Sequence, residues 1–283
     1  MGLYSDLVKS NEPRAKKRFG QHFLRDTGIL DRISRLIHPE ESDFFLEIGA
    51  GDGALSTRLT GHAARFIAVE IDIDRIDLLR QSLAPFDNAE IVQADILAID
   101  LEHLVFPHFK PGHRLRIVGN LPYNIATAII EKALRAPIPV ADMHFMVQLE
   151  VAQRIAAEPG TREYGYFSVY CRRHADVNIE FTVSPACFVP RPKVYSAMIS
   201  LHPKAMRTES GVEPVFVTLC KAAFAYRRKT IENSLGRHPV IGKIARALLE
   251  RAGIDGTLRA ESLSVRDYEI LAEIAFNEFS LSS

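Results

Sequence analysis

The chain has 283 residues, of which 47% are hydrophobic and 25% charged, and its formal net charge at pH 7 is zero. This composition is typical of a globular protein with one large domain, or with a catalytic domain and a small appendage, and the zero net charge excludes a uniformly basic nucleic-acid-binding protein. No run of about 18 or more apolar residues predicts a membrane span, and Lys9, Arg14 and Lys16 interrupt the region where a signal peptide has its apolar core.

Short apolar runs alternate with helical stretches from about residue 43 onward. The predicted strands are residues 44–48, 66–70, 89–93, 115–118 and 144–148, and the clearest helices between them are residues 71–83 and 126–135. This alternation predicts an α/β fold, in which a parallel sheet carries helices on both faces. Ligands bind such sheets beyond the carboxyl ends of the strands. The residues that follow each apolar run are therefore the candidates for a functional site.

The pattern changes after about residue 201. Residues 203–213 are polar and punctuated, and the remainder has the pattern of several short helices with no strand among them. We therefore place a domain boundary near Lys204, which gives a sheet-containing domain of residues 1–203 and a small all-helical domain of residues 204–283.

The cysteines and the basic residues are the remaining features of composition. Cys171, Cys187 and Cys220 are far apart and form no Cys-x-x-Cys pair, so we expect reduced thiols, no metal site and a cytoplasmic location. Basic residues gather in two places, which are residues 9–25 and a C-terminal cluster of Lys221, Arg227, Arg228, Lys229 and Arg237. These could form a local phosphate-binding face or an ordinary solvated surface, and charge alone does not decide between them.

The first predicted strand runs into a glycine-rich turn, from Glu47 through Gly49 and Gly51 to Gly53. Glycines at alternate positions let the backbone turn sharply and approach a ligand. The spacing is tighter than the G-x-G-x-x-G pattern that holds a dinucleotide pyrophosphate. A carboxylate at Glu47 would not favour a pyrophosphate but would tolerate a cationic ligand. The turn therefore favours cofactor binding over a plain tight turn.

The next two strands each end in an acidic residue. Glu70 lies roughly where an acidic side chain accepts hydrogen bonds from ribose hydroxyls, although it could be one exposed acid among several. Asp95, flanked by apolar Ile96 and Leu97, could accept the amino hydrogen of a cofactor adenine or could be a helix N-cap. The three strand ends together point to a cofactor site much more strongly than any one of them.

The fourth strand ends in the tetrapeptide Asn120-Leu121-Pro122-Tyr123. The N6 amine of adenine is a poor nucleophile because its lone pair is delocalised, and acceptors for its hydrogens restore its reactivity. The Asn120 side-chain oxygen and the Leu121 carbonyl could be those acceptors. Pro122 stiffens the turn, and Tyr123 offers a face on which a flipped-out base can stack. The tetrapeptide predicts methylation of an amine, but alone it leaves DNA, RNA and glutamine substrates open.

These segments and several others occur in the order of a known family. The matching segments run from Lys17 to Leu24, from Ser184 to Val194, from Phe224 to Thr230 and from Arg259 to Ser264, besides the strand ends above. Over nearly its whole length the chain resembles the ribosomal RNA adenine N6,N6-dimethyltransferases, specifically the bacterial small-subunit enzymes. The resemblance implies a Rossmann-like S-adenosylmethionine methyltransferase sheet with a helical C-terminal domain, and S-adenosylmethionine as the cofactor without a metal.

The resemblance also implies a role for each site residue. The implied cofactor-binding residues are His22, Leu24, Gly49, Glu70, Asp95 and Asn120, and the implied catalytic residues are Asn120, Leu121, Tyr123 and Phe188. His22 and Leu24 would close over the cofactor, while Gly49 would line its methionine end. Glu70 would hold its ribose and Asp95 its adenine. Asn120 and the Leu121 carbonyl would position the target amine, with Tyr123 and Phe188 on the two faces of the flipped base.

The implied substrate is a pair of adjacent adenosines in a hairpin loop near the 3′ end of small-subunit (16S) RNA, dimethylated by a monomer late in assembly of the 30S particle. The C-terminal basic cluster would hold RNA phosphates, and residues 1–20 are expected to be partly disordered until a ligand or RNA binds. Alternatives are a large-subunit (23S) RNA methyltransferase that confers macrolide resistance, a non-catalytic assembly or transcription factor, and a nicotinamide dehydrogenase. The matches at residues 227–230 and 259–264 favour the small-subunit enzyme.

Two positions depart from the family pattern. Leu149 stands where the family usually has lysine, and Tyr195 follows Lys193 and Val194 where an aspartate is usual. Neither belongs to the implied methyl-transfer residues. We expect these departures to alter local packing or contacts with RNA.

Overall fold

The structure is a computed structural model, and it describes residues 21–205 and 211–279. The strands are β1 (Phe23–Leu24), β2 (Asp43–Ile48), β3 (Arg65–Glu70), β4 (Ala89–Gln93), β5 (Arg114–Asn120), β6 (Val140–Gln148), β7 (Ala175–Val183), β8 (Phe188–Val189) and β9 (Ser196–Pro203). The α-helices are α1 (Thr27–Ile37), α2 (Ser56–Leu59), α3 (Ile73–Leu83), α4 (Leu101–Val105), α5 (Ala126–Arg135), α6 (Leu149–Ala156), α7 (Tyr166–His174), α8 (Val212–Phe224), α9 (Ile231–Leu235), α10 (Ala245–Ala252) and α11 (Val265–Phe279).

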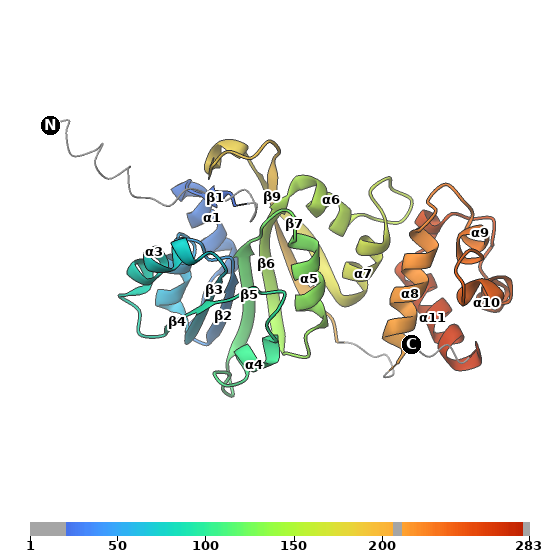
Figure 1. Cartoon of the computed structure of the whole chain (residues 1–283), viewed down its shortest axis with the longest axis horizontal. Helices are drawn as coiled ribbons and strands as arrows, with labels where there is room; N and C mark the ends of the chain where they lie inside the picture. Colours follow the sequence, from blue (N-terminus) through green and yellow to red (C-terminus); the bar gives the residue numbers. More distant parts are fainter. Residues whose placement is uncertain (1–20, 206–210, 280–283) are drawn as a thin grey trace. The chain divides into compact units, whose positions relative to one another are not determined.

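The described part of the chain is built on a seven-stranded sheet in the order β4-β3-β2-β5-β6-β9-β7 (Figure 1). The five predicted strands are β2 to β6, and each pairs in parallel with its neighbours among them. β7 and β9 were not predicted, and β9 runs antiparallel to β6. The predicted parallel sheet is thus confirmed for its five strands, and β9 adds an antiparallel neighbour that the sequence did not predict. Neighbouring parallel strands need a crossover connection, and β6 and β9 instead pair in opposite directions.

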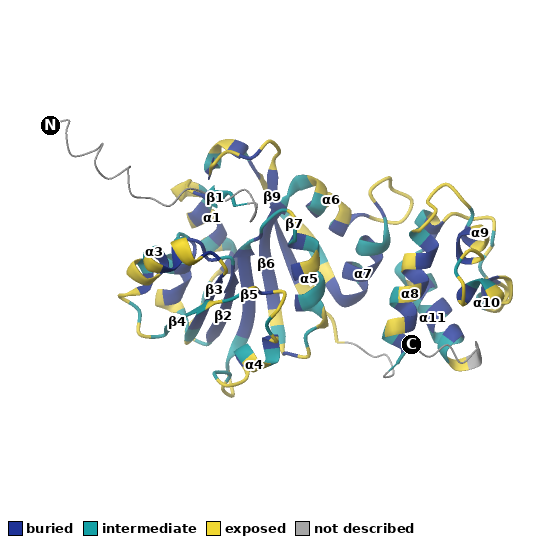
Figure 2. Cartoon of the chain, in the orientation of Figure 1, coloured by how far each residue is buried: buried dark blue, intermediate teal, exposed yellow. Residues whose placement is uncertain are grey.

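Helices cover the central strands because alternate residues of each strand point to opposite faces. All six residues of β2 are buried, and the central strands are buried along most of their length (Figure 2). On one face, Phe45 belongs to a core cluster with Leu30 and Ile33 of α1 and Leu79 of α3. On the other face, the ring of Phe44 stacks on that of Phe109, with centroids 6.4 Å apart. Burial on both faces fixes the register, and so the positions of the strand ends.

The chain divides into two compact units. The sheet unit contains the described residues up to Leu149 together with Ile179–Leu201, and the helical unit contains Glu150–Asn178 and the described residues from His202 onward. The chain passes into the helical unit for the second time after Leu201, close to the predicted boundary at Lys204. The prediction, however, placed residues 150–178 in the first domain. These residues belong to the helical unit because Tyr164 and Val169 join its core cluster with Phe216.

Apolar packing holds the helical unit together. Its core includes Leu219 of α8, Leu248 of α10 and Leu271 of α11, each with at most 1% of its surface exposed. The Arg173 guanidinium at the end of α7 lies 3.9 Å from the centre of the Phe216 ring on α8. Among the residues that the structure describes, no helix is both long enough and apolar enough to cross a membrane.

Candidate functional site

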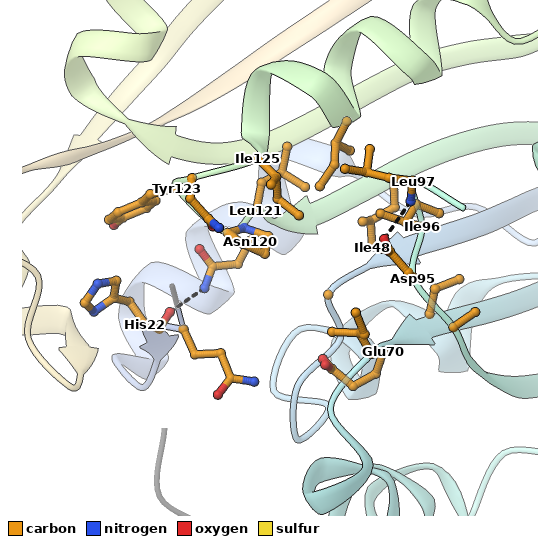
Figure 3. Close-up of a pocket in the computed structure, with 18 of the residues that line it drawn as sticks. His22, Ile48, Glu70, Asp95, Ile96, Leu97, Asn120, Leu121, Tyr123 and Ile125 are labelled. Carbon is orange, nitrogen blue, oxygen red and sulfur yellow. Dashed lines mark hydrogen bonds between the residues drawn. The ribbon is translucent and has the colours of Figure 1, made fainter. Parts of the chain in front are cut away.

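A cavity of about 290 Å³ lies at the carboxyl ends of the parallel strands in the sheet unit (Figure 3). The predicted site residues in its wall are His22, Gly49, Glu70, Asp95, Asn120, Leu121 and Tyr123. They come together because β4, β3, β2 and β5 are neighbours with the same direction, so their ends meet at one edge of the sheet. Two predicted residues are absent from this wall, namely Leu24, which lines a smaller cavity beside Gly49, and Phe188.

The glycine-rich turn after β2 needs glycine for conformation and for space. Gly49 and Gly51 have φ values of 73° and 60°, in the left-handed region that side chains with a Cβ disfavour. A Cβ atom on Gly51 would also lie 3.1 Å from the Phe23 ring. The Gly51 amide donates a hydrogen bond of 2.8 Å to Glu70. The turn therefore connects the ends of β2 and β3 and leaves backbone open toward the cavity.

Glu70 is held in place by the backbone. One carboxylate oxygen accepts from the Gly51 amide, and the other accepts from the Asp72 amide at 2.8 Å. The side chain is 5% exposed, and burial raises its pKa above the ordinary value despite these hydrogen bonds. Because each carboxylate oxygen has two lone pairs, Glu70 can still accept a hydrogen bond from a ligand hydroxyl in the cavity.

Glu47 adds a second buried carboxyl group near the turn. It is 2% exposed, and burial raises its pKa to about 8, although the Ser56 hydroxyl donates a hydrogen bond to it. Nearby Glu70 and Asp52 raise it further. The Glu47 carboxyl therefore keeps its proton at neutral pH, and a cationic ligand beside it would favour the ionised form, which an anionic phosphate would disfavour. The surroundings of the turn therefore suit a cation and not the pyrophosphate of a dinucleotide.

The far end of the cavity is apolar. Ile48, Ile96, Leu97 and Ile125 contribute to its wall, and Figure 3 shows the first three near Asp95. One Asp95 oxygen accepts a hydrogen bond of 2.9 Å from the Leu97 amide, which fixes the carboxylate in its turn. Asp95 is not a helix N-cap, because the next helix, α4, begins at Leu101 with Asp100 as its N-cap, and the second Asp95 oxygen is left for a ligand. An apolar slot beside a carboxylate acceptor suits a purine with an exocyclic amine.

Asn120 is oriented by the backbone of the N-terminal segment. Its side-chain nitrogen donates a hydrogen bond of 2.7 Å to the carbonyl oxygen of His22 (Figure 3). Because a carbonyl can only accept, this bond fixes which end of the amide is the nitrogen. The amide oxygen is left as an acceptor at the cavity. The next residue is fixed as well, since the Leu121 amide donates to the Met146 carbonyl at 3.0 Å.

Tyr123 is held from two sides. Its hydroxyl lies 2.5 Å from the Ser196 hydroxyl at the start of β9, and its ring centroid lies 5.1 Å from that of His22 at an interplanar angle of 30°. Burial raises the pKa of the Tyr123 phenol, so it stays protonated at neutral pH. A neutral ring with a fixed hydroxyl is suited to stacking on a base rather than to proton transfer.

The opening and late motifs of the sequence meet in a small antiparallel sheet. Phe23 of β1 pairs with Val189 of β8, and Leu24 pairs with Phe188. His22 lies beside this sheet, and its Nδ1 is 2.7 Å from the Pro190 carbonyl oxygen. Pairing with the late motif thus positions His22, whose own carbonyl accepts from Asn120.

Phe188 is buried and does not line the cavity, and its implied stacking role stays a prediction. It is 2% exposed and belongs to the core cluster of the sheet unit, while the neighbouring Val189 is 58% exposed. Strand alternation explains the difference, because successive residues of β8 point in opposite directions. In this structure the ring beside Tyr123 is that of His22.

Ser196 is a site residue that the sequence did not reveal. It belongs to a strand that was not predicted, and it is far from Tyr123 in the chain although the two hydroxyls touch. The apolar residues Ile48 and Ile125 were also missed as part of the cavity wall. Ile48 carried a signal, since it lies between Glu47 and Gly49 at the end of a predicted strand.

Leu149 and Tyr195, the two residues expected to depart from the family pattern, lie next to each other. The Leu149 amide donates a hydrogen bond of 3.0 Å to the Tyr195 carbonyl, which adds a rung beyond the pair of Gln148 and Ser196 at the end of the β6–β9 ladder. Leu149 is half-buried, and Tyr195 is 55% exposed. Tyr195 therefore immediately precedes Ser196, the residue whose hydroxyl holds the Tyr123 hydroxyl.

The C-terminal basic cluster belongs to the helical unit, and its members differ in their contacts. Arg227 donates to the carbonyls of Arg162 and Tyr164, at 2.6 and 3.1 Å, and lies 3.6 Å from a Glu261 oxygen. Lys221 lies over the Tyr166 ring and Arg237 over the Tyr226 ring, with the charged groups 5.2 and 5.0 Å from the ring centres. Arg228 and Lys229 are exposed and have no ion-pair partner among the described residues.

Other expectations concern the N-terminal residues and metals. Residues 1–20, with most of the first basic segment, lie outside the described residues, and Arg25 at the end of that segment pairs with Asp52 at 2.6 Å. All three cysteines are free thiols. Within residues 21–205 and 211–279, no group of three or more His, Cys, Asp or Glu side chains is arranged to hold a metal ion.

Comparison with known proteins adds to this geometry. Residues 12–276 match the family described as ribosomal RNA adenine dimethylase. A relative from Pseudomonas fluorescens, named ribosomal RNA small subunit methyltransferase A, is 40% identical over 268 residues, which cover 94% of this chain and 96% of the relative.

Solved structures confirm the predicted α/β fold class. A dimethyladenosine transferase from Plasmodium falciparum superposes with a TM-score of 0.78 at 25% identity, covering 92% of this chain and 99% of that one. A 23S rRNA methyltransferase, ErmE, superposes with a TM-score of 0.66 at 26% identity, covering 89% of this chain and 98% of that one. The likeness in both cases extends over nearly the whole of each chain.

Proposed function

The chain belongs to the ribosomal RNA adenine dimethylase family, and we propose that it uses S-adenosylmethionine to dimethylate the N6 amines of two adjacent adenosines near the 3′ end of small-subunit (16S) ribosomal RNA. The observation that carries this proposal is the Asn120 amide. Its nitrogen is bound by the His22 carbonyl, so its oxygen remains as an acceptor beside Tyr123 at the cavity. An amine acceptor next to an aromatic face is what methylation of an adenine requires.

The cavity suits S-adenosylmethionine on the chemistry of its walls. Glu70 would accept from the ribose hydroxyls, and Asp95, with Ile96 and Leu97, would hold the adenine. The open glycine turn at Gly49 would border the methionine portion, near the buried carboxyl groups that favour positive charge. When bound, this cofactor supplies a methyl group on a sulfonium sulfur, which becomes a neutral thioether once the methyl has left.

The chain's own residues would act by orientation rather than by strong acid–base chemistry. The Asn120 oxygen and the Leu121 carbonyl would accept hydrogen bonds from the target amine and so direct its lone pair toward the methyl donor. Tyr123 would stack on the base, with its hydroxyl fixed by Ser196. The amine becomes acidic once it is alkylated and loses a proton to solvent, and thus needs no strong base. Apolar walls at the cofactor would keep water away from the reacting carbon.

The small-subunit substrate is favoured over large-subunit RNA by the degree of similarity. The relative named for the small subunit is 40% identical, whereas the 23S methyltransferase is 26% identical over a similar share of the chain.

We further propose that the protein acts as a cytoplasmic monomer on the 30S particle late in its assembly. Exposed Arg228 and Lys229 would bind RNA phosphates from the helical unit.

Methyl transfer to isolated subunits tests the proposal. The purified protein, given S-adenosylmethionine with a labelled methyl group, should label immature small subunits from a strain that lacks this modification. Fully modified subunits are the control and should take up little label. Mass spectrometry of the RNA should place dimethyladenosine at two neighbouring nucleotides. Label found only in large-subunit RNA would refute the substrate, and no transfer to either RNA would support a non-catalytic assembly factor.

A further inference from the structure

The loop between β8 and β9 carries exposed apolar side chains beside the cavity. In this loop, which we call the 189–195 loop, Val189, Val194 and Tyr195 are 58%, 46% and 55% exposed. Among the described residues, the Tyr195 side chain forms no hydrogen bond and contacts no other aromatic ring. An exposed aromatic ring is ordinary by itself, so the case depends on where this ring lies and on its neighbours.

Both ends of the 189–195 loop are attached to residues of the proposed target site. Near its start, the Pro190 carbonyl lies 2.7 Å from His22 Nδ1, and the His22 ring faces the Tyr123 ring. Immediately after its end, the Ser196 hydroxyl lies 2.5 Å from the Tyr123 hydroxyl. The loop therefore borders the position where Tyr123 would meet a base.

Positive charge is interleaved with the apolar residues of the loop. Arg191 and Lys193 are exposed, and neither has an ion-pair partner among the described residues. Cations that alternate with an aromatic ring are the combination that binds single-stranded nucleic acid, because phosphates pair with the cations while bases stack on the ring. A purely apolar partner would leave both cations without compensation, and an acidic protein partner would make no use of a flat exposed ring.

The backbone of Tyr195 is fixed. Its carbonyl accepts a hydrogen bond of 3.0 Å from the Leu149 amide, at the junction of β6 and α6, and β9 begins at the next residue. A ring on a fixed backbone has only its side-chain torsions to order when a base stacks on it, so the entropic cost of binding is small.

We propose that Tyr195 stacks on an unpaired nucleotide next to the target adenosine, while Arg191 and Lys193 bind phosphates of the same strand. This inference rests on the proposed function, because that function brings the RNA strand to Tyr123. It adds a second stacking position outside the cavity, at a residue where this chain departs from its family. Tyr195 is then a substrate-binding residue, and its loss should affect RNA recognition without changing the methyl-transfer step.

Steady-state kinetics with the full-length protein test this role. Tyr195→Ala should raise the KM for the RNA substrate about tenfold, the effect expected from losing one stacked base, with kcat and the Kd for S-adenosylmethionine unchanged. Tyr195→Phe keeps the ring and should behave like the wild type. Phe106→Ala is the matched control, because Phe106 is 47% exposed in the same unit but follows α4, toward the amino ends of the strands (Figure 1). The inference is wrong if Tyr195→Ala resembles Phe106→Ala, or if Tyr195→Phe is as impaired as Tyr195→Ala.

The salt dependence of binding to a short single-stranded RNA gives an independent readout. Stacking releases no counterions, so Tyr195→Ala should weaken binding and leave the slope of log Kd against log salt unchanged. Lys193→Ala should reduce that slope by about 0.7, the value for one lost phosphate contact on a single strand. A general loosening of the site by Tyr195→Ala would instead lower the melting temperature and the affinity for S-adenosylmethionine, and that result would overturn the inference.

The outcome can be separated from that of the proposed function. If the wild-type protein methylates a different RNA, the substrate assignment fails, but the comparison of Tyr195→Ala with Tyr195→Phe on that RNA still measures stacking. If small-subunit RNA is methylated and Tyr195→Ala has the wild-type KM, the function stands and the stacking inference fails.

Discussion

The cavity of the sheet unit and the basic cluster of the helical unit use their polar residues differently. At the cavity, Glu70 and Asn120 each end a buried strand, and backbone groups orient both side chains while leaving them able to accept a further hydrogen bond at the cavity. In the basic cluster, Arg227 donates hydrogen bonds to carbonyls of its own unit, while the neighbouring Arg228 has no ion-pair partner among the described residues. A polar residue at the end of a buried strand therefore indicates a binding role much better than a basic residue on a helical surface does.

Replacing Asn120 is the strongest way to break this comparison. Asn120→Ala should reduce the rate of methyl transfer about 100-fold or more, because the target amine loses a preorganised hydrogen-bond partner. Affinity for S-adenosylmethionine, measured by calorimetry, should change little. Asn124→Ala is the matched control, since Asn124 lines the same cavity without a hydrogen bond to the N-terminal segment. Equal rates for the two variants would remove Asn120 from catalysis.

The same contrast explains how much the sequence could predict. Buried strands fix the direction and spacing of their ends, so the sequence alone assigns Glu70, Asp95 and Asn120 to one edge of the sheet. The sequence alone does not place the Ser196 hydroxyl at this edge, because Ser196 belongs to an antiparallel strand that no predicted helix directly precedes. Nor does it reveal the burial of Phe188, because a two-residue strand has too little pattern to show which side chain points inward.

The sequence did not show, for a related reason, that residues 150–178 group with the helical unit. A helix after a strand normally covers the sheet from which it came, and connectivity alone predicts that here. Tyr164 and Val169 instead bury their side chains in the core of the helical unit, with Phe216 and Leu219. Which of two cores an amphipathic helix joins depends on the shape and chemistry of both surfaces, and neither can be read from the periodicity of one segment.

Charge reversal at Arg228 sharpens the comparison from the other unit. Arg228→Glu should weaken binding of the RNA substrate about tenfold and should reduce the slope of log Kd against log salt, because at least one phosphate contact is lost. The melting temperature should stay at the wild-type value, since Arg228 is exposed and has no ion-pair partner among the described residues. Filter binding across a salt series measures both quantities. Wild-type binding would return Arg228 to the ordinary solvated surface.

Arg227 should respond in the opposite way to its neighbour. Arg227→Ala removes two hydrogen bonds to the carbonyls of Arg162 and Tyr164 and should lower the free energy of unfolding by about 1 kcal/mol, since the side chain is half exposed. Thermal unfolding measures this loss. The salt slope of RNA binding should change less than in Arg228→Glu. A stable Arg227→Ala variant with a reduced slope would show that both arginines bind phosphate.

The buried carboxyl group of Glu47 tests how the cavity constrains stability. Its pKa is about 8 in the folded protein against an ordinary value of 4.5, so the folded state holds this proton more tightly than the unfolded state. The corresponding stability is fully present below pH 4.5 and is lost as the pH rises through 8. Each unit of pKa shift corresponds to about 1.4 kcal/mol. Glu47→Gln, which cannot ionise, should therefore gain stability relative to the wild type as the pH rises.

Urea unfolding at acid, neutral and alkaline pH measures that difference. Glu41→Gln is the control, because Glu41 is exposed just before the same strand and should show no such trend. A constant difference between Glu47→Gln and the wild type at all pH values would mean that Glu47 ionises in the folded state as freely as in the unfolded chain.

The smallest expected effect concerns the hydroxyl pair of Tyr123 and Ser196. Ser196→Ala and Tyr123→Phe each remove the same hydrogen bond and should each lower kcat/KM about fivefold, equivalent to roughly 1 kcal/mol. Because both changes break one interaction, the double variant should be no worse than either single variant. Additive losses would show that the two hydroxyls act separately. Losses that do not add would establish that β9, which the sequence did not predict, positions the Tyr123 ring just after β5, which the sequence did predict.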